Sequence, residues 1–377
     1  MHKKALNILI APDKFKGSLG AVAVAEAIAR GMHKQHRAHH IVRQPMADGG
    51  DGSIDLLAQL GQLTQHTTQV NDPLFRPIEA VYYTQDDTAF IEMAKASGLA
   101  LLAKQERNCL NTTSLGTGEL ILDAIRQGFR KINLFIGGSA TNDAAIGIAQ
   151  ALGYQFLDQD QQVLAPIGGN LERIASLKKN EESPDIDEVK FQVVCDVNNP
   201  FFGESGAAHV YAPQKGANAA EVAQLDQGLR NIHEVFRAAG LPNIQDLPGA
   251  GAAGGIGGGM VAMFGARLVS GIDLFIDWFG LEAKVQQADV VITGEGQLDE
   301  QSVQGKVIGG VAQLCKKHQK PLIVVCGQNT LSAAARQRAQ IREVKAIMEY
   351  APSVEEAMGR AAEFLETIGE AIEVNVE

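Results

Sequence analysis

Carboxylates, lysines and glycines follow three apolar runs of the sequence. DKFKGS (residues 13–18) follows the first run, ADGGDG (47–52) the second and TGEGQLD (293–299) the third. Mg²⁺ and lysine neutralise phosphate oxygens during phosphoryl transfer, and an aspartate accepts the proton of the attacking hydroxyl. Carboxylates are also the protein groups that bind Mg²⁺. The three segments therefore suggest a site that holds an anion through a cation.

Each of these segments also has a simpler explanation. DGGDG can be a turn whose aspartate caps the following helix, and DKFK can be a solvated loop. However, all three segments follow predicted strands, and ligands of open α/β sheets bind at the carboxyl ends of the strands. This shared position favours a functional site.

A second polar group follows the apolar run 132–136 (INLFI), which leads into GGSATND. Gly137 and Gly138 allow a sharp turn, and a helix placed directly after them would present free N–H groups to an anion or a carboxylate. An ordinary capped strand-to-helix turn is the alternative. The nearby segment NTTSLGTGEL is similar, with Thr112 ahead of a helix expected to begin near Gly118.

Two further segments offer charged side chains. Asp196 closes the run FQVVC, where a carboxylate could act as a base or bind a metal, and Asn198 is two residues further on. Turn formation by the sequence NNP is an equally good explanation. Lys215, in PQKG, is a cation that could contact a phosphate.

The densest glycine run places seven glycines within residues 249–259. Its first part matches the dinucleotide fingerprint G-x-G-x-x-G, but the residues DLP stand where that motif requires a hydrophobic strand. We interpret the run instead as a mobile loop, or one whose backbone approaches a phosphate closely. Walker A spacing is missing, because Val307 follows Gly305-Lys306.

The elements that position these segments alternate in type. Strand-like and helical patterns follow one another at both ends of the chain, and this indicates a parallel sheet covered by helices. Residues 65–93 are hairpin-like, and the pattern is mixed up to about residue 270. The expected strands are 6–10, 40–46, 290–292, 322–325 and 344–348, and the expected helices are 19–36, 53–60, 303–317 and one from Ser353.

Composition narrows the class of protein. The 377 residues carry a net charge of −11 and 45% hydrophobic residues, which favours a folded acidic protein over a binder of nucleic acid or anionic membranes. The four cysteines form no Cys-x-x-Cys pair, and no apolar stretch approaches 18 residues. We therefore expect a cytoplasmic protein whose partners are small molecules, with a homo-oligomer left open.

Taken in order along the chain, these motifs resemble the bacterial glycerate kinase type-1 family. The resemblance rests on IAPDKFKGSL, PMADGGDGS, NTTSLGTGELI, GGSATNDAAIGIAQALG, CDVNNP, YAPQKGA, PGAGAAGGIGGGM and DVVITGEGQLDEQSVQGK. It implies ATP-dependent phosphorylation of D-glycerate at the 2-hydroxyl, giving 2-phospho-D-glycerate, with ATP and Mg²⁺ as cofactors. It also implies an α/β fold of two domains, with the active site in the cleft between them. Residues 1–66 and 275–377 would form a Rossmann- or flavodoxin-like parallel-sheet domain, interrupted by a mixed α/β domain over residues 67–274.

We assign roles to individual residues as a hypothesis. Asp196 is the candidate base, and Lys14, Lys16 and Lys215 would hold the substrate carboxylate or the ATP phosphates. Asp48, Asp51 and Glu295 are candidates for Mg²⁺. The expected substrate- and ATP-binding residues are Asp13, Ser18, Gly49, Gly50, Thr112, Gly137, Gly138, Ser139, Asn142, Asp143, Asn198, Gln214, Gly254, Gly255, Gly294, Gln297 and Asp299. The alternatives are an NAD-dependent oxidoreductase acting on a small hydroxy acid and a non-catalytic protein that binds small acids.

Overall fold

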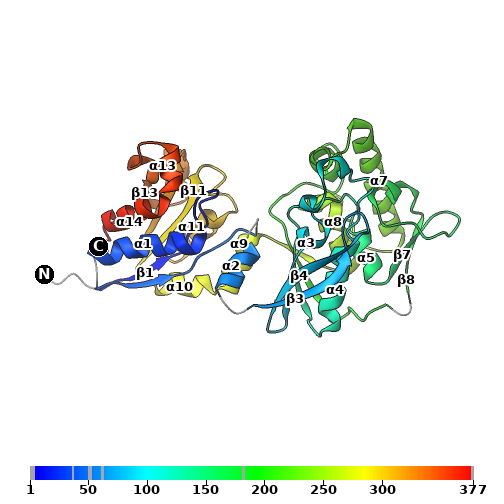
Figure 1. Cartoon of the computed structure of the whole chain (residues 1–377), viewed down its shortest axis with the longest axis horizontal. Coiled ribbons are helices and arrows are strands. Elements are labelled where there is room, and N and C mark those ends of the chain that lie inside the picture. Colours follow the sequence, from blue (N-terminus) through cyan, green and yellow to red (C-terminus); the bar gives the residue numbers. More distant parts are fainter. Residues whose placement is uncertain (1–4, 36–37, 50–52, 61–62, 181–182, 375–377) are drawn as a thin grey trace. The chain divides into compact units, whose positions relative to one another are not determined.

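The chain divides into two compact units. The computed structural model describes residues 5–35, 38–49, 53–60, 63–180 and 183–374. The first unit combines Met1–Gln59 with Ser270–Glu377, and the second is Leu60–Val269 (Figure 1). None of the described helices combines the length and the apolar character that a membrane-spanning segment requires.

The first unit is built on a five-stranded sheet in which every neighbouring pair is parallel. The strand order is β13-β12-β11-β1-β2. The strands are β1 (Asn7–Ile10), β2 (His40–Arg43), β11 (Val290–Leu298), β12 (Leu322–Asn329) and β13 (Ile341–Ala346). The central residues of the three inner strands β1, β11 and β12 are buried and mostly apolar, as expected for parallel strands that are covered on both faces.

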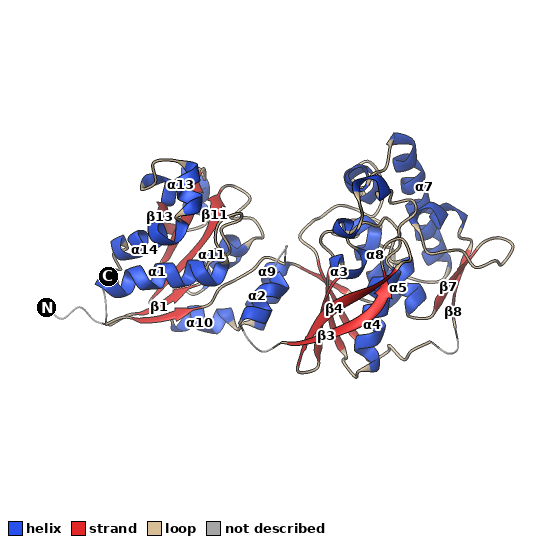
Figure 2. Ribbon diagram, in the orientation of Figure 1, coloured by secondary structure: helices blue, strands red, loops and turns tan. Residues whose placement is uncertain are grey.

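Helices cover both faces of this sheet. Ile8, Ile292 and Ile323 face the core shared with α1 (Ala21–Gln35) and α14 (Ala361–Ala371) (Figure 2). These two helices pack closely, since a Cβ on Gly31 would lie only 1.9 Å from the carbonyl oxygen of Glu366. The other helical elements are α2 (Ser53–Gln59), α9 (Gly271–Trp278), α10 (Leu281–Gln287), α11 (Val307–Lys317), α12 (Ala333–Arg338), η5 (Ile347–Glu349) and α13 (Val354–Gly359).

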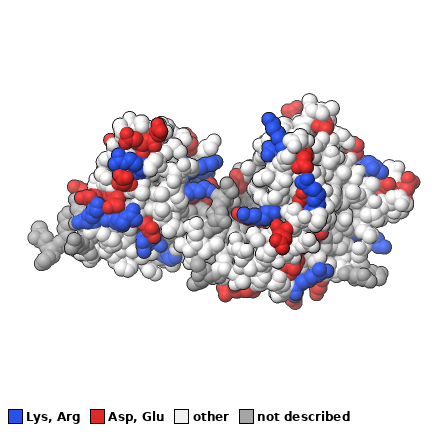
Figure 3. Space-filling view, in the orientation of Figure 1, with Lys and Arg blue, Asp and Glu red and all other residues white. Residues whose placement is uncertain are grey.

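The surface of the first unit carries both signs of charge. Figure 3 shows basic and acidic side chains next to one another over this unit. Arg30 and Lys34 of α1 pair with Glu366 of α14, at 3.0 and 2.7 Å between charged atoms. These pairs are solvent-exposed, so each contributes little to stability. They orient the two helices rather than mark a binding surface.

The second unit contains a six-stranded mixed sheet of order β10-β9-β6-β5-β4-β3. The antiparallel pairs β3–β4 and β4–β5 confirm the predicted hairpin pattern, and the remaining neighbours are parallel. The strands are β3 (Thr64–Asn71), β4 (Pro77–Gln85), β5 (Thr88–Glu92), β6 (Lys131–Phe135), β9 (Lys190–Val194) and β10 (Arg267–Val269), with a separate pair β7 (Tyr154–Leu157) and β8 (Ser176–Lys179). The predicted α/β class is therefore confirmed in both units.

Helical segments surround this mixed sheet. The α-helices are α3 (Ala94–Ser97), α4 (Leu115–Arg126), α5 (Ile146–Ala151), α6 (Ala207–Tyr211), α7 (Ala219–Ala238) and α8 (Ala252–Phe264). The 3₁₀ turns are η1 (Leu99–Leu101), η2 (Lys104–Glu106), η3 (Gly168–Arg173) and η4 (Pro213–Lys215).

The prediction of a loop for the glycine run is wrong for its last part, because residues 256–259 are helical within α8 (Ala252–Phe264). Its first part is not regular helix, because Gly249 lies in a turn with positive φ, and Ala253, Gly254 and Gly255 also adopt positive φ. A Cβ on Gly259 would lie 2.0 Å from the carbonyl oxygen of Ala144. These glycines allow a helix to pack against neighbouring backbone, which offsets their poor helix propensity. Close packing against neighbouring backbone therefore accounts for the glycines of the helical part.

Several predicted element boundaries were also wrong, since β2 ends at Arg43, α11 begins at Val307 and β13 spans Ile341–Ala346. β11 continues through Glu295 and Gln297 to Leu298, because its ladder with β12 continues as far as Asn329. A Cβ on Gly294 would lie 2.1 Å from the carbonyl oxygen of Val325, so glycine allows this continuation. In the second unit, no helix directly follows Gly137 and Gly138. The next helix, α5, begins only at Ile146, after an irregular buried segment.

Candidate active site

Three carboxylates gather at the carboxyl edge of the parallel sheet of the first unit. Asp13 follows β1, Asp48 follows β2, and Glu295 lies near the end of β11. The backbone N–H of Asp13 donates to the carbonyl of Gly294 at 2.8 Å, and that of Met46 donates to Pro12 at 2.9 Å. These bonds hold the chain after β1 and β2 beside β11. The sheet therefore positions the three acidic side chains.

Burial disfavours the ionised forms of this carboxylate cluster, and the nearby charges of Lys14 and Lys306 offset only part of that cost. Asp13 is 7% exposed, and its burial raises its pKa to about 7, with the charges of Asp48 and Glu295 adding to the shift. Glu295 is 9% exposed, and burial raises its pKa as well. Its Oε1 has no hydrogen-bond partner among the described residues. A cation would offset the mutual repulsion of these groups and would use the unpaired oxygen.

The donor set fits Mg²⁺ but does not form a cage. Among the described residues, no group of three or more His, Cys, Asp or Glu side chains is spaced to hold a metal. Mg²⁺ commonly binds one or two carboxylates and completes its shell with water and substrate phosphates. Asp48 and Glu295 supply oxygen donors of that kind. Asp51 and Gly50 lie outside the described residues.

The loop after β1 carries the two lysines. Lys14 is half-buried and Lys16 is exposed. The backbone N–H of Phe15 donates to the carbonyl of Leu19 at 2.7 Å, which closes the loop. The Ser18 hydroxyl donates to the carbonyl of Met358 at 2.6 Å, so Ser18 anchors the loop to α13. The lysines are thus held at the same edge of the sheet as the carboxylates.

The other predicted residues of this unit differ in environment. Gly49 is half-buried and Gln297 is exposed on β11. Asp299 accepts hydrogen bonds from the backbone N–H groups of Gln301 and Ser302, at 2.8 and 3.0 Å. Asp299 therefore stabilises the turn after β11.

The second unit contains a buried lysine that is hydrogen-bonded to a serine. Lys215 is 3% exposed and Ser139 is 6% exposed. The Lys215 Nζ donates to the Ser139 Oγ and to the carbonyl of Thr141, both at 2.7 Å. Burial lowers the pKa of Lys215 to about 8, while nearby Cys109 and Asp143 act in the opposite direction. The ammonium thus lies in an interior position that disfavours its charge.

The backbone around Ser139 is held by the segment after α3. Gly138 adopts φ +72°, and its carbonyl accepts a bond from the N–H of Leu99 at 2.9 Å. The N–H of Ala140 donates to the carbonyl of Ser97 at 2.9 Å. Gly137 and Gly138 themselves are exposed. The turn therefore leaves Ser139 next to surface backbone that carries no side chain.

Asp143 is fully buried behind this pair. Its Oδ2 accepts bonds from the backbone N–H of Ser114 at 2.7 Å and from the Ser114 hydroxyl at 2.8 Å. Burial raises the pKa of Asp143 to about 6. The Thr112 hydroxyl donates to the carbonyl of Ala140 at 2.9 Å, tying the same segment to 139–143.

Several buried polar atoms of this segment have no hydrogen-bond partner among the described residues. They are the Thr141 hydroxyl, both amide atoms of Asn142 and the Asp143 Oδ1. Buried polar atoms are normally paired, so a group of unpaired ones indicates a place for water or a polar ligand. Gly254 also packs here, since a Cβ on it would lie 2.2 Å from the Thr141 carbonyl oxygen. Gly255 instead packs against Phe201 and Leu229.

Three predicted residues lie at the surface of the second unit. Asp196 and Asn198 are exposed in the loop after β9, which ends at Val194. Gln214 is exposed on η4, next to buried Lys215.

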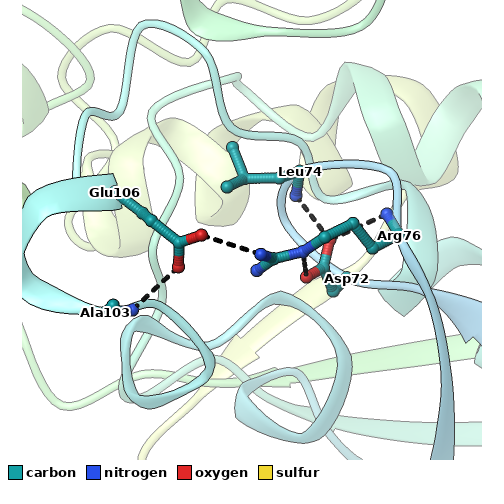
Figure 4. A network of polar contacts seen from close by, with 5 residues as sticks. All are labelled: Asp72, Leu74, Arg76, Ala103 and Glu106. Carbon is teal, nitrogen blue, oxygen red and sulfur yellow. Dashed lines mark hydrogen bonds and ion pairs between the residues drawn. The ribbon is translucent and has the colours of Figure 1, made fainter.

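Sequence reasoning missed Ser114, whose two bonds to Asp143 were not predicted. The run NTTS was the available signal, but it does not show which hydroxyl faces an acid 29 residues away. It also missed the network drawn in Figure 4, in which Arg76 bridges Asp72 and Glu106. Asp72 also accepts bonds from the backbone N–H groups of Leu74 and Arg76. This network fixes the β3–β4 turn, whose Pro73 carbonyl accepts from the N–H of Thr113.

The dinucleotide fingerprint does not have its required context in the structure. Residues 240–251, which precede and overlap the match, contain no strand. The motif needs a strand that leads into a glycine turn and then a helix. Nothing in the fold therefore favours the oxidoreductase alternative.

Comparisons with known proteins give one consistent result. The model of the glycerate kinase family matches residues 8–376. A glycerate 2-kinase from Escherichia coli (strain K12) is 41% identical over 327 residues, covering 86% of each chain. A glycerate kinase from Bacillus subtilis (strain 168) is 39% identical over 99% of this chain and 98% of its own.

A solved structure gives the same result. A crystal structure described as glycerate kinase 2 from Salmonella typhimurium LT2 matches with a TM-score of 0.84 and 36% identity, covering 98% of this chain and 97% of that one. The family match spans both units and includes both clusters of polar residues. The chain therefore belongs to the glycerate kinase family and is a phosphotransferase.

Proposed function

We propose that this protein transfers the γ-phosphoryl group of ATP to the 2-hydroxyl of D-glycerate, giving 2-phospho-D-glycerate and ADP. The observation that carries the reaction type is the carboxylate cluster at the ends of β1, β2 and β11, with two lysines on the adjoining loop. The substrate is suggested by the relatives, one of which is named glycerate 2-kinase.

In this proposal the first unit binds the nucleotide phosphates. Asp48 and Glu295 would hold Mg²⁺, directly or through water, and Lys14 and Lys16 would contact phosphate oxygens. Bound Mg²⁺ would neutralise the charge on the transferring phosphoryl group. The unpaired Oε1 of Glu295 supports this assignment, because a buried carboxylate oxygen without a donor is costly.

The second unit would bind the acceptor. Asp196 is our candidate base for the glycerate hydroxyl, and its exposure leaves it accessible to a substrate. Lys215 and Ser139 provide a cation and a hydroxyl for an anionic group. The carboxylate and lysine cluster of the first unit and the Lys215–Ser139 pair of the second would then serve one reaction. That the active site lies in a cleft between the two domains stays a prediction. We also place the reaction in the cytoplasm, where ATP is made and the four free cysteines would remain reduced.

A coupled assay for ADP tests the proposal. ADP should form in the presence of Mg-ATP and D-glycerate, and much more slowly with L-glycerate or with glycerol. Phosphorus NMR of the product should show a phosphate ester at carbon 2. Formation of the 3-phosphate would correct the regiochemistry, and a lack of D-glycerate-dependent ADP would refute the kinase. NADH titration that shows tight binding would instead support the oxidoreductase.

A further inference from the structure

We propose that Lys215 and Ser139 bind the carboxylate of D-glycerate, so that the second unit selects hydroxy acids over polyols. This inference rests on the proposed function and assigns the substrate group that this pair recognises. The pair lies in a mixed α/β unit, 76 residues apart in the sequence, and is held at a hydrogen-bond distance of 2.7 Å.

The hydrogen-bond inventory leaves two donors for a ligand. A protonated lysine carries three N–H groups, and Lys215 uses one on Ser139 and one on the Thr141 carbonyl. Ser139 accepts from Lys215, so its own O–H remains available to donate. No other hydrogen bond of either side chain occurs among the described residues. One ammonium N–H and one hydroxyl match the two oxygens of a carboxylate.

The charge balance also calls for an anion. No carboxylate of the described residues lies within ion-pair distance of the Lys215 Nζ, although its charge is buried. The neighbouring titratable groups are Asp143 and the thiol of Cys109. Asp143 directs its Oδ2 to Ser114 instead, and burial raises the pKa of Cys109 to about 11, so the thiol is neutral. A ligand carboxylate would supply the missing counter-charge.

Size favours a carboxylate over a polyphosphate. Both side chains are almost fully buried, so the pair can be reached only by a small group. In the same segment the buried Thr141 hydroxyl and Asn142 amide have no hydrogen-bond partner among the described residues, so a small polar ligand would find further partners there. A triphosphate brings several charges that one buried cation cannot balance. The half-buried Lys14 and exposed Lys16 of the first unit suit it better.

The test compares two ligands that differ in the carboxylate. D-Glycerate and glycerol are titrated calorimetrically, without ATP, into the wild-type protein and into Lys215→Met. The wild type should bind D-glycerate about 10- to 100-fold more tightly than glycerol, as expected for charge-assisted hydrogen bonds. In Lys215→Met this ratio should fall to about threefold or less, with little change in Mg-ATP affinity.

Two further variants keep the test decisive. Ser139→Ala should reduce the ratio by about 3- to 10-fold, and it provides the result if Lys215→Met does not fold. Lys104→Met removes an exposed lysine of the same unit and should leave the ratio unchanged.

A retained ratio in both site variants would overturn the inference. The inference would also be overturned if the variants lost affinity for Mg-ATP but kept their affinity for D-glycerate. The same holds if the wild type showed no measurable binding of D-glycerate. Failure of the kinase proposal would be recognised separately: D-glycerate would bind in a Lys215-dependent way, but no ADP would form.

Discussion

Replacing Lys215 with methionine should abolish efficient catalysis while removing a source of instability that depends on pH. Methionine has similar length and no charge, so the interior can remain filled. In the wild type the ammonium is buried, and burial lowers its pKa from 10.5 to about 8. The folded protein therefore binds fewer protons than the unfolded chain between these two pH values. Its stability relative to Lys215→Met should rise as pH increases through that window.

The magnitude follows from the shift. The pKa of Lys215 differs by about 2.5 between the unfolded and the folded state. At about 1.36 kcal/mol per pKa unit, this difference changes the free energy of unfolding by about 3.4 kcal/mol over the whole window. Titration is incomplete at both ends of the range from pH 7 to pH 10. Over this range the free energy of unfolding of the wild type should rise by about 2.5 kcal/mol relative to that of the variant. The test therefore rests on how the difference between the two proteins changes with pH, and not on its value at any single pH.

Urea unfolding from pH 7 to pH 10 measures this gain. Far-UV circular dichroism follows both units, whereas fluorescence follows the first unit alone, because the only tryptophan, Trp278, lies there. The Trp278 transition should be the same in both proteins. Lys104→Met, which removes an exposed lysine of the second unit, should show no such pH dependence. A pH-independent difference between wild type and Lys215→Met would refute the claim that burial destabilises this ammonium.

Three further predictions concern other residues. Asp196→Asn should lower kcat by about 10²- to 10⁴-fold with a smaller change in KM, if Asp196 is the base, and a near-normal kcat would remove it from that role. Glu295→Gln should raise the Mg²⁺ concentration for half-maximal activity by about tenfold or more, and weaker Mn²⁺ binding measured by electron paramagnetic resonance should accompany it. Gly259→Ala should destabilise the protein by about 2 kcal/mol or more in urea titrations, because its Cβ meets the carbonyl oxygen of Ala144. Gly359→Ala, in α13 with open space around it, should be neutral or stabilising by up to about 1 kcal/mol, and equal effects of the two alanines would contradict the packing argument.

Much of the first unit could be predicted because its pattern is local. Each strand there is a short apolar run, and each is followed by its polar residues within a few positions. Parallel strands bring their carboxyl ends to one edge, so Asp13, Asp48 and Glu295 could be assigned to that edge from the sequence, whereas the structure decided that β1 lies between β2 and β11. The prediction failed where long-range pairing extended a strand, as in β11, which continues beyond Ile292 along β12.

The glycine run illustrates a different failure. Its composition predicted a loop, since glycine disfavours helices. Its last residues are helical nevertheless, and glycine there permits a close approach of distant backbone, since a Cβ on Gly259 would lie 2.0 Å from the carbonyl oxygen of Ala144. Such approaches leave no trace in local propensity. A run of glycines in a sequence therefore does not separate a ligand-binding loop from a closely packed helix.

By itself, the sequence determined the α/β class, the order of strands and helices, and the polar segments that follow the strands. These properties depend on the period of apolar residues and on turn residues, which act over a few positions. Only the tertiary structure decided that Lys215 contacts Ser139, and that Ser114 holds Asp143. It also decided which charges are buried. Desolvation is a property of the surrounding fold, so the pKa values of Lys215 and Asp13 exist only once distant segments have packed around them.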